Sequence, residues 1–138
     1  MSTLKLQVAT PDGLALLTNA EMVTAPSVEG EFGVLPGHLP LLAATRAGLL
    51  KYRVDGKEAV AAVGPGFVEA LPDGVLLLTD AFLKPSEVDL GAAERDLAEA
   101  EERIAKLDGP RDAGEHQEAE RDLDWARARI EAKKLAAN

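Results

Sequence analysis

The stretch that decides the fold is Glu29-Gly30-Glu31-Phe32-Gly33-Val34-Leu35-Pro36-Gly37-His38-Leu39-Pro40-Leu41-Leu42. It combines glycines and prolines, which are typical of turns, with apolar side chains that ordinary solvated loops lack. The two prolines fix φ and remove backbone donors, and Gly37 permits a conformation closed to other residues. We therefore expect a stiff segment that lies against something else. It is either a buried crossover between two sheets or a shaped contact surface that holds Glu31 and His38.

Short alternating segments on either side of this stretch are typical of strands. Alternation of apolar and polar side chains predicts a strand over 4–9, and short segments bounded by turn signals predict strands over 14–18, 21–25, 48–54, 57–63, 67–71 and 75–79. Turn sequences such as Asp55-Gly56 and Pro72-Asp73-Gly74 lie between neighbouring segments. We therefore predict that residues 1–84 form an all-β domain, a sandwich of short antiparallel strands built on Val, Leu and Ala.

The pattern changes at Lys84-Pro85-Ser86, where alternation stops and charged residues and alanines begin to dominate. Apolar residues then recur at helical spacing in two stripes: Ala93, Leu97, Ala100, Ile104 and Leu107, and then Ala119, Leu123, Ala126 and Ile130. Asp108-Gly109-Pro110 separates the stripes. The sequence therefore predicts an antiparallel α-helical hairpin over 85–138, with helices at about 87–107 and 113–136.

The predicted hairpin has narrow apolar stripes and clear start signals. Ser86 with Asp89, and Asp112 with Glu115, have the spacing of helix caps. Burial of each large side chain contributes only about 1.5–3 kcal/mol before entropy is subtracted. We therefore expect the hairpin to be marginal alone and able to change its packing partner. Trp125, beside the second stripe, is either a surface residue or packs against the sandwich or the first helix.

Composition excludes several classes of protein. A net charge of −9 argues against nucleic-acid binding and against docking on anionic lipid by charge. The chain has no cysteine, so disulfides and thiolate chemistry are excluded. No apolar run approaches the roughly 20 residues of a membrane span, and the start lacks the apolar region of a signal peptide. We expect a soluble protein of cytosolic type.

Catalytic patterns are not evident in the sequence. His38 has no nearby Asp to orient it as a general base, and metal-ligand spacing and a phosphate-binding Gly-Lys loop are absent. We therefore predict a protein with no catalytic residues, no metal and no cofactor. The enzymatic alternative is a small hydrolase or isomerase that uses His38 with Glu31. The binding alternative is a free-standing adaptor whose helical hairpin binds an unrelated client.

Charge is graded along the second predicted helix. Acidic residues come first, and the basic residues Arg127, Arg129, Lys133 and Lys134 come last. Complementarity to the helix macrodipole, about 0.3–1 kcal/mol per charge, explains this gradient, and so does pairing with the acidic start of the first helix. The functional interpretation is that the basic end, once released, docks on an acidic segment of a partner.

Residues 30–42 resemble the signature of the epsilon subunit of the rotary F-type ATP synthase, bacterial or plastid type. The most specific part is the pattern Gly-x-Leu-Pro-Gly-His-x-Pro, and matching segments follow in order at 64–69, 75–81 and 88–90. Together they span nearly the whole chain. The resemblance implies a non-catalytic rotor subunit of the central stalk, which couples rotation of the c-ring to the gamma shaft.

The resemblance also implies roles for individual residues. Glu31 and His38 would contact the c-ring, and Leu41 and Leu42 would pack on gamma or in the core. The hairpin, with its basic end, would extend towards the alpha/beta catalytic head and inhibit ATP hydrolysis. The subunit would be peripheral, on the cytoplasmic face of the energy-transducing membrane (the plasma membrane in bacteria). It would touch the membrane only through the complex.

Some members of this family bind ATP through an aliphatic residue, Asp, two variable positions and then Arg-Ala. Val88, Asp89 and Ala93 match this pattern, whereas Ala92 stands where the Arg is expected. Without that cation a phosphate chain loses a charge-assisted donor. Helix capping explains Asp89 without any ligand. We therefore predict that the chain does not bind nucleotide.

Overall fold

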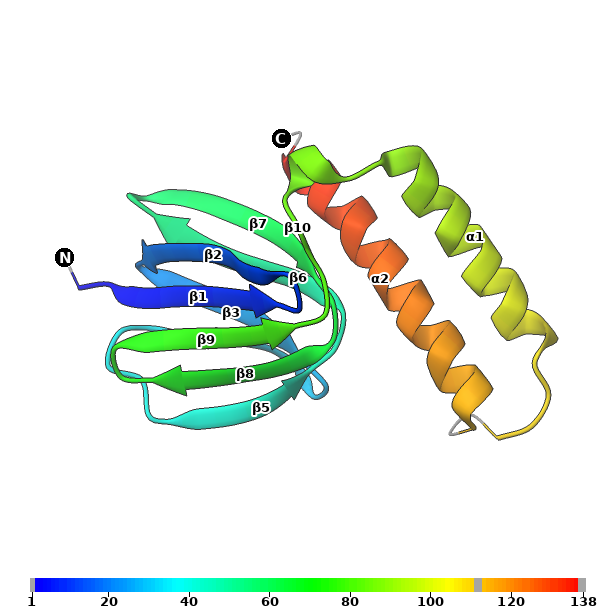
Figure 1. Ribbon diagram of the computed structural model, residues 1–138, viewed down its shortest axis with the longest axis horizontal. Coiled ribbons are helices and arrows are strands. Elements are labelled where there is room, and N and C mark those ends of the chain that lie inside the picture. Colours follow the sequence, from blue (N-terminus) through cyan, green and yellow to red (C-terminus); the bar gives the residue numbers. More distant parts are fainter. Residues whose placement is uncertain (1, 111–112, 137–138) are drawn as a thin grey trace.

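The computed structural model describes residues 2–110 and 113–136, and its strands form two five-stranded sheets packed face to face (Figure 1). The first sheet has the order β2-β1-β9-β8-β5, with β1 (Leu4–Thr10), β2 (Gly13–Ala20), β5 (Leu41–Thr45), β8 (Gly66–Leu71) and β9 (Gly74–Thr79). The second has the order β10-β7-β6-β3-β4, with β3 (Met22–Ser27), β4 (Gly30–Val34), β6 (Gly48–Val54), β7 (Lys57–Val63) and β10 (Phe82–Leu83). The predicted β-sandwich is confirmed.

One strand pair departs from the antiparallel rule. β1 and β9 run parallel, with Leu6 opposite Val75, whereas the other paired strands are antiparallel. Tight hairpins impose antiparallel pairing on neighbours in sequence, but β1 and β9 are separated by the whole excursion into the second sheet. No tight turn therefore fixes the relative direction of β1 and β9, and they can pair in parallel.

The core of the sandwich lies between the two sheets. Its fully buried members come from alternate positions of the strands and include Leu4, Leu6, Val8, Val23, Val34, Leu50, Val63, Val68 and Leu77. They are almost all Val, Leu and Ala, as the sequence predicts. Phe32 and Tyr52 pack against this cluster from its margin.

The decisive stretch crosses from one sheet to the other. β4 lies at the edge of the second sheet and β5 at the edge of the first, so residues 35–40 join the two layers. The crossover interpretation is correct, but the crossover is not buried, because Leu35 and Leu39 are 57% and 79% exposed. Gly37 takes φ +84° and donates its N–H to the carbonyl of Pro72 at 2.7 Å. The backbone of the crossover is thus held by a hydrogen bond, and its leucine side chains are exposed to solvent.

Three helical segments follow the strands: a short 3₁₀ helix (Pro85–Glu87), α1 (Leu90–Lys106) and α2 (Gly114–Ala136). α1 begins later than the predicted 87 because Asp89, and not Ser86, is its N-cap. The Asp89 carboxylate accepts a hydrogen bond from the Ala92 N–H at 3.0 Å. The proposed cap Asp112 lies outside the described residues.

α2 lies between the second sheet and α1 (Figure 1). Ala93 and Ala100 of α1 and Ala119 and Ala126 of α2 are buried, in agreement with the predicted stripes. A second face of α2, formed by Trp125, Ala128 and Ala132, packs on the outer side of β6 and β7. The expectation that Trp125 packs against the sandwich is therefore confirmed. No helix within the described residues is long and apolar enough to cross a membrane.

Candidate functional site

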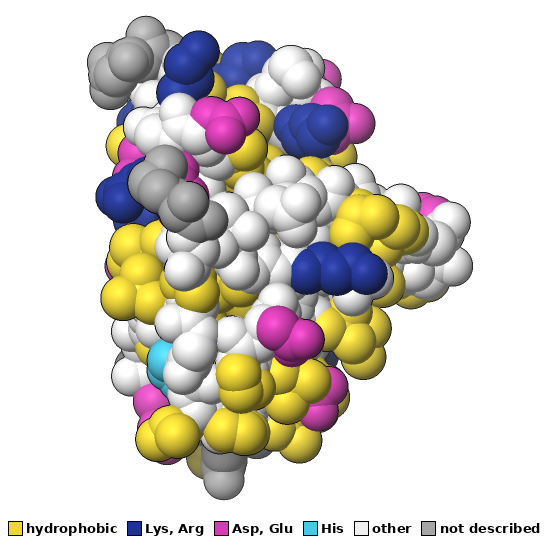
Figure 2. Space-filling view, turned by 90° about the vertical axis from the view of Figure 1, so that its left-hand side faces the viewer, with side chains coloured by type: hydrophobic (Ala, Val, Ile, Leu, Met, Phe, Trp, Pro, Cys, Tyr) yellow, Lys and Arg dark blue, Asp and Glu magenta, His cyan; other side chains and the backbone are white. Residues whose placement is uncertain are grey.

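The end of the sandwich away from the hairpin, here called the distal end, displays apolar side chains around the crossover. Leu35 and Leu39 project from the crossover itself, and Leu71 projects from the end of the neighbouring strand β8. Figure 2 views this end and shows hydrophobic side chains gathered over its lower part. The crossover is braced by two backbone hydrogen bonds, from Gly37 to Pro72 and from His38 to Leu35. Exposed apolar groups on a stiff backbone are typical of a protein contact surface.

The structure places His38 on the crossover and Glu31 on edge strand β4. His38 is half-buried, and its Nδ1 lies 2.6 Å from the carbonyl oxygen of Leu39. Glu31 projects from the outer face of the second sheet, because its neighbours Phe32 and Val34 turn towards the core. Its carboxylate pairs with Lys51 at 3.4 Å. Within the described residues no hydrogen bond or ion pair joins Glu31 to His38, so the geometry gives no support to an acid–base pair.

The outer face of the first sheet carries a second exposed surface, here called the apolar sheet face. Its members are Leu14, Leu17, Leu42, Phe67 and Leu78. Phe67 lies directly opposite Leu78 in the β8–β9 register, and Leu42 lies opposite Glu69 on the next strand pair. Leu41 is opposite the core residue Ala70 and so turns inward at the rim. Leu42 is thus 70% exposed on the apolar sheet face, whereas Leu41 faces inward at the rim and is still 36% exposed.

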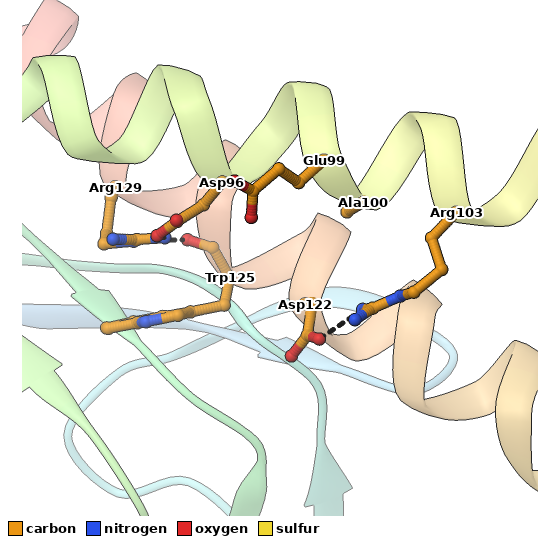
Figure 3. Close-up of a pocket in the computed structure, with 7 residues that line it drawn as sticks. All are labelled: Asp96, Glu99, Ala100, Arg103, Asp122, Trp125 and Arg129. Atoms are coloured by element: carbon orange, nitrogen blue, oxygen red, sulfur yellow. Dashed lines mark hydrogen bonds and ion pairs between the residues drawn. The ribbon is translucent and has the colours of Figure 1, made fainter.

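The basic end of α2 is engaged within the subunit. Arg129 donates to the Asp96 carboxylate of α1 at 2.8 Å, and its guanidinium carbon lies 5.3 Å from the centroid of the Trp125 ring (Figure 3). Lys133 donates to the carbonyl of Pro85 at 3.1 Å. Arg127 and Lys134 are exposed. Docking of this end on a partner would therefore require Arg129 and Lys133 to exchange their present contacts.

A groove lies between α1 and α2, C-terminal to the partial nucleotide motif at the start of α1. It has a volume of about 250 Å³ and is lined mainly by charged side chains: Asp96, Glu99, Arg103, Asp122 and Arg129. Arg103 donates a hydrogen bond to the Asp122 carboxylate (Figure 3). This hydrogen bond raises the pKa of Arg103 above its ordinary value. A phosphate chain would have to compete with carboxylates that already occupy both guanidinium groups. Asp89 already caps α1 through the Ala92 N–H, and the absence of nucleotide binding stays a prediction.

Comparison with known proteins assigns the class first. Residues 3–85 match the family described as ATP synthase, Delta/Epsilon chain, beta-sandwich domain. Proteins named ATP synthase epsilon chain match beyond that domain. The protein from Synechococcus sp. (strain WH7803) is 37% identical over 132 residues, covering 96% of this chain and 97% of the relative. The one from Nitratidesulfovibrio vulgaris (strain DP4) is 34% identical over 128 residues, covering 93% of each. The chain belongs to the epsilon-chain family of the F-type ATP synthase.

Solved structures share the whole fold. A chain in the Euglena gracilis mitochondrial ATP synthase (OSCP/F1/c-ring, rotational state 1) superimposes with a TM-score of 0.79. It is 21% identical, and the match covers 100% of this chain and 83% of that chain. As an epsilon chain, the protein is a non-catalytic subunit of the rotary stalk of the membrane-associated complex. The resemblance predicted from the sequence is confirmed, and the enzymatic alternative is excluded.

Proposed function

We propose that the sandwich couples the c-ring to the gamma shaft through its two exposed apolar surfaces. In this proposal the distal end rests on the c-ring and the apolar sheet face packs on gamma. The two surfaces meet at β5, which leaves the crossover at Leu41 and carries Leu42 on the apolar sheet face. The observation that carries the proposal is the pinned crossover, which holds Leu35, His38 and Leu39 at the distal end on a braced backbone.

Polar contacts to the c-ring are proposed for His38 and Glu31. His38 shares the crossover with the exposed Leu39, so a partner that covers Leu39 also approaches the imidazole. Glu31 is 55% exposed in its side chain and paired with a solvated Lys51, so exchange of this partner for one on the ring costs little. The same proposal places the subunit on the cytoplasmic face of the energy-transducing membrane, the plasma membrane in bacteria.

The hairpin is proposed to regulate ATP hydrolysis by leaving the sandwich and extending towards the alpha/beta catalytic head. α2 touches the sandwich mainly through alanines, and the sandwich core is made of strand residues alone. Release therefore exposes little apolar surface and leaves the core intact. In the extended state Arg127, Arg129, Lys133 and Lys134 would face acidic segments of the catalytic head.

The coupling proposal is tested with the double variant Glu31→Ala/His38→Ala in the assembled, membrane-bound complex. Weaker attachment of the catalytic head to the membrane is expected, measured as the hydrolysis activity released by a low-salt wash. The thermal midpoint of the isolated subunit should stay close to that of the parent, because surface changes usually fall within about 0.5 kcal/mol. Glu58→Ala, which removes another exposed carboxylate that is paired with a basic residue, Arg53, is the matched control. Attachment as strong as in the control would contradict the proposal.

A further inference from the structure

The contact between the hairpin and the sandwich is made by α2. Figure 1 shows α1 on the far side of α2, away from both sheets. The apolar part of this contact joins Leu49 and Ala62 of the second sheet to Ala128 and Ala132 of α2, with Val60 and Trp125 at its margin. Five of these six side chains are small or only partly buried, so the apolar part alone stabilises the docked position weakly.

An ion pair lies beside this apolar contact. Arg46, the residue after β5, donates from Nη2 to Oδ2 of Asp124 on α2 at a distance of 2.7 Å. The Asp124 side chain is only 19% exposed, whereas that of Arg46 is 54% exposed. A largely desolvated carboxylate needs a charged or hydrogen-bonding partner. The pair therefore stabilises the docked position of α2, although it lies outside the core of the sandwich.

Asp124 is adjacent in sequence to Trp125, which packs against the same apolar contact. Separation of α2 from the sandwich would therefore break the Arg46–Asp124 pair and expose the Trp125 indole together. Arg129, which lies over the Trp125 ring, is held by Asp96 of α1 and stays with the hairpin when it moves. The Arg46–Asp124 pair, in contrast, joins two parts of the chain that separate.

We propose that Arg46 and Asp124 form an electrostatic clasp that sets the fraction of subunits with a released hairpin. The clasp rests on the proposed function, because a released hairpin is its regulatory form. It deepens that function by naming the side chains that control release. Since Arg46 is half-exposed, salt weakens the clasp, and hairpin release in the free subunit increases with ionic strength.

The clasp is tested in the full-length isolated chain with Arg46→Ala. The matched control is Arg53→Ala, which removes a similarly exposed arginine paired with Glu58 at 2.9 Å but away from α2. Trp125 is the only tryptophan, so quenching of its emission by acrylamide reports release. We expect Arg46→Ala to raise the released-to-docked ratio about two- to fivefold and the control to leave it unchanged. Added NaCl should raise quenching in the parent and have a smaller effect in Arg46→Ala.

The charge swap Arg46→Asp/Asp124→Arg separates the clasp from general loss of stability. Restoration of low quenching and of salt sensitivity in the swap supports the pair. Quenching in Arg46→Ala equal to that of the parent would overturn the clasp, and so would an equal rise in Arg53→Ala. ATP hydrolysis by the assembled complex gives an independent reading. Unchanged hydrolysis with increased release would refute the regulatory function and leave the clasp standing.

Discussion

Gly37 donates its backbone N–H to the carbonyl of Pro72 at 2.7 Å and so ties the crossover to the β8–β9 turn. The two residues belong to connections that start from different sheets. Their hydrogen bond closes the distal end and fixes the backbone from which Leu35, His38 and Leu39 project. Gly37 can make it because its φ of +84° lies in the left-handed region, where residues with a Cβ are strained.

We expect Gly37→Ala to destabilise the subunit by about 1–2 kcal/mol, the cost of a left-handed conformation for an L-residue. A Cβ at this position meets nothing within 4 Å, so the loss comes from φ and not from a clash. Denaturant unfolding of the isolated subunit measures it. Gly114→Ala, which is equally free of clashes and lies at the start of α2, is the control and should be neutral or stabilising. Equal stability of Gly37→Ala and the parent would contradict the strain argument.

A chain ending at Lys84 should retain a folded sandwich, because within the described part of the chain the buried members of the core cluster all precede that residue. Cooperative thermal unfolding and the circular dichroism of a β protein measure this in the isolated fragment. In the assembled complex, ATP hydrolysis should rise or stay constant, since the proposed inhibitory element is gone. A marked fall in hydrolysis with normal assembly would refute inhibition by the hairpin.

Calorimetry with ATP should show no binding at millimolar or tighter affinity. Ala92 supplies no cation, and Asp89 already accepts a hydrogen bond from the Ala92 N–H. Ala92→Arg restores the expected pattern and is the informative comparison, because it adds a charge-assisted phosphate donor at the helix start. Saturable heat with the parent chain would show that another residue, such as Arg95, takes that place.

Stability should fall at alkaline pH because of Tyr52. Burial raises the pKa of the Tyr52 hydroxyl above its ordinary value of 10.0. The neutral phenol is thus favoured in the folded state, and its contribution is fully present below pH 10. It is lost as pH rises through the folded-state pKa. Tyr52→Phe keeps the ring and removes the titration, so its stability should decline less above pH 10 in denaturant unfolding. Parallel curves for the two proteins would contradict this assignment.

Much of the sandwich was predictable because its strands alternate with period two between tight turns. The prediction missed the short edge strands β4 and β5. The glycines and prolines of the decisive stretch indicate a turn, and only its central part, between these two strands, is one. The parallel pairing of β1 with β9 was also beyond local patterns, because no hairpin connects them. Long-range pairing depends on how the whole chain crosses between the sheets.

Of the candidate surfaces, the crossover could be found from the sequence and the apolar sheet face could not. Leu42, Phe67 and Leu78 alternate out of phase with the core, but in strands rich in Val and Leu this difference carries little signal. The sheet-facing side of α2 was missed for a similar reason. Ala128 and Ala132 are weakly apolar, so only the stripe towards α1 stands out, and the Arg46–Asp124 pair spans 78 positions.

The separation of the two packing units has an evolutionary consequence. Among the described residues, the buried cluster of the sandwich contains strand residues only, and the match to the family model ends at residue 85. Substitutions in the hairpin therefore do not alter the core between the two sheets, although they can alter the contact of α2 with Leu49 and Ala62. Natural selection can adjust the length, charge and docking strength of the hairpin in each lineage while the core of the sandwich stays fixed. Variation among relatives should concentrate after residue 85.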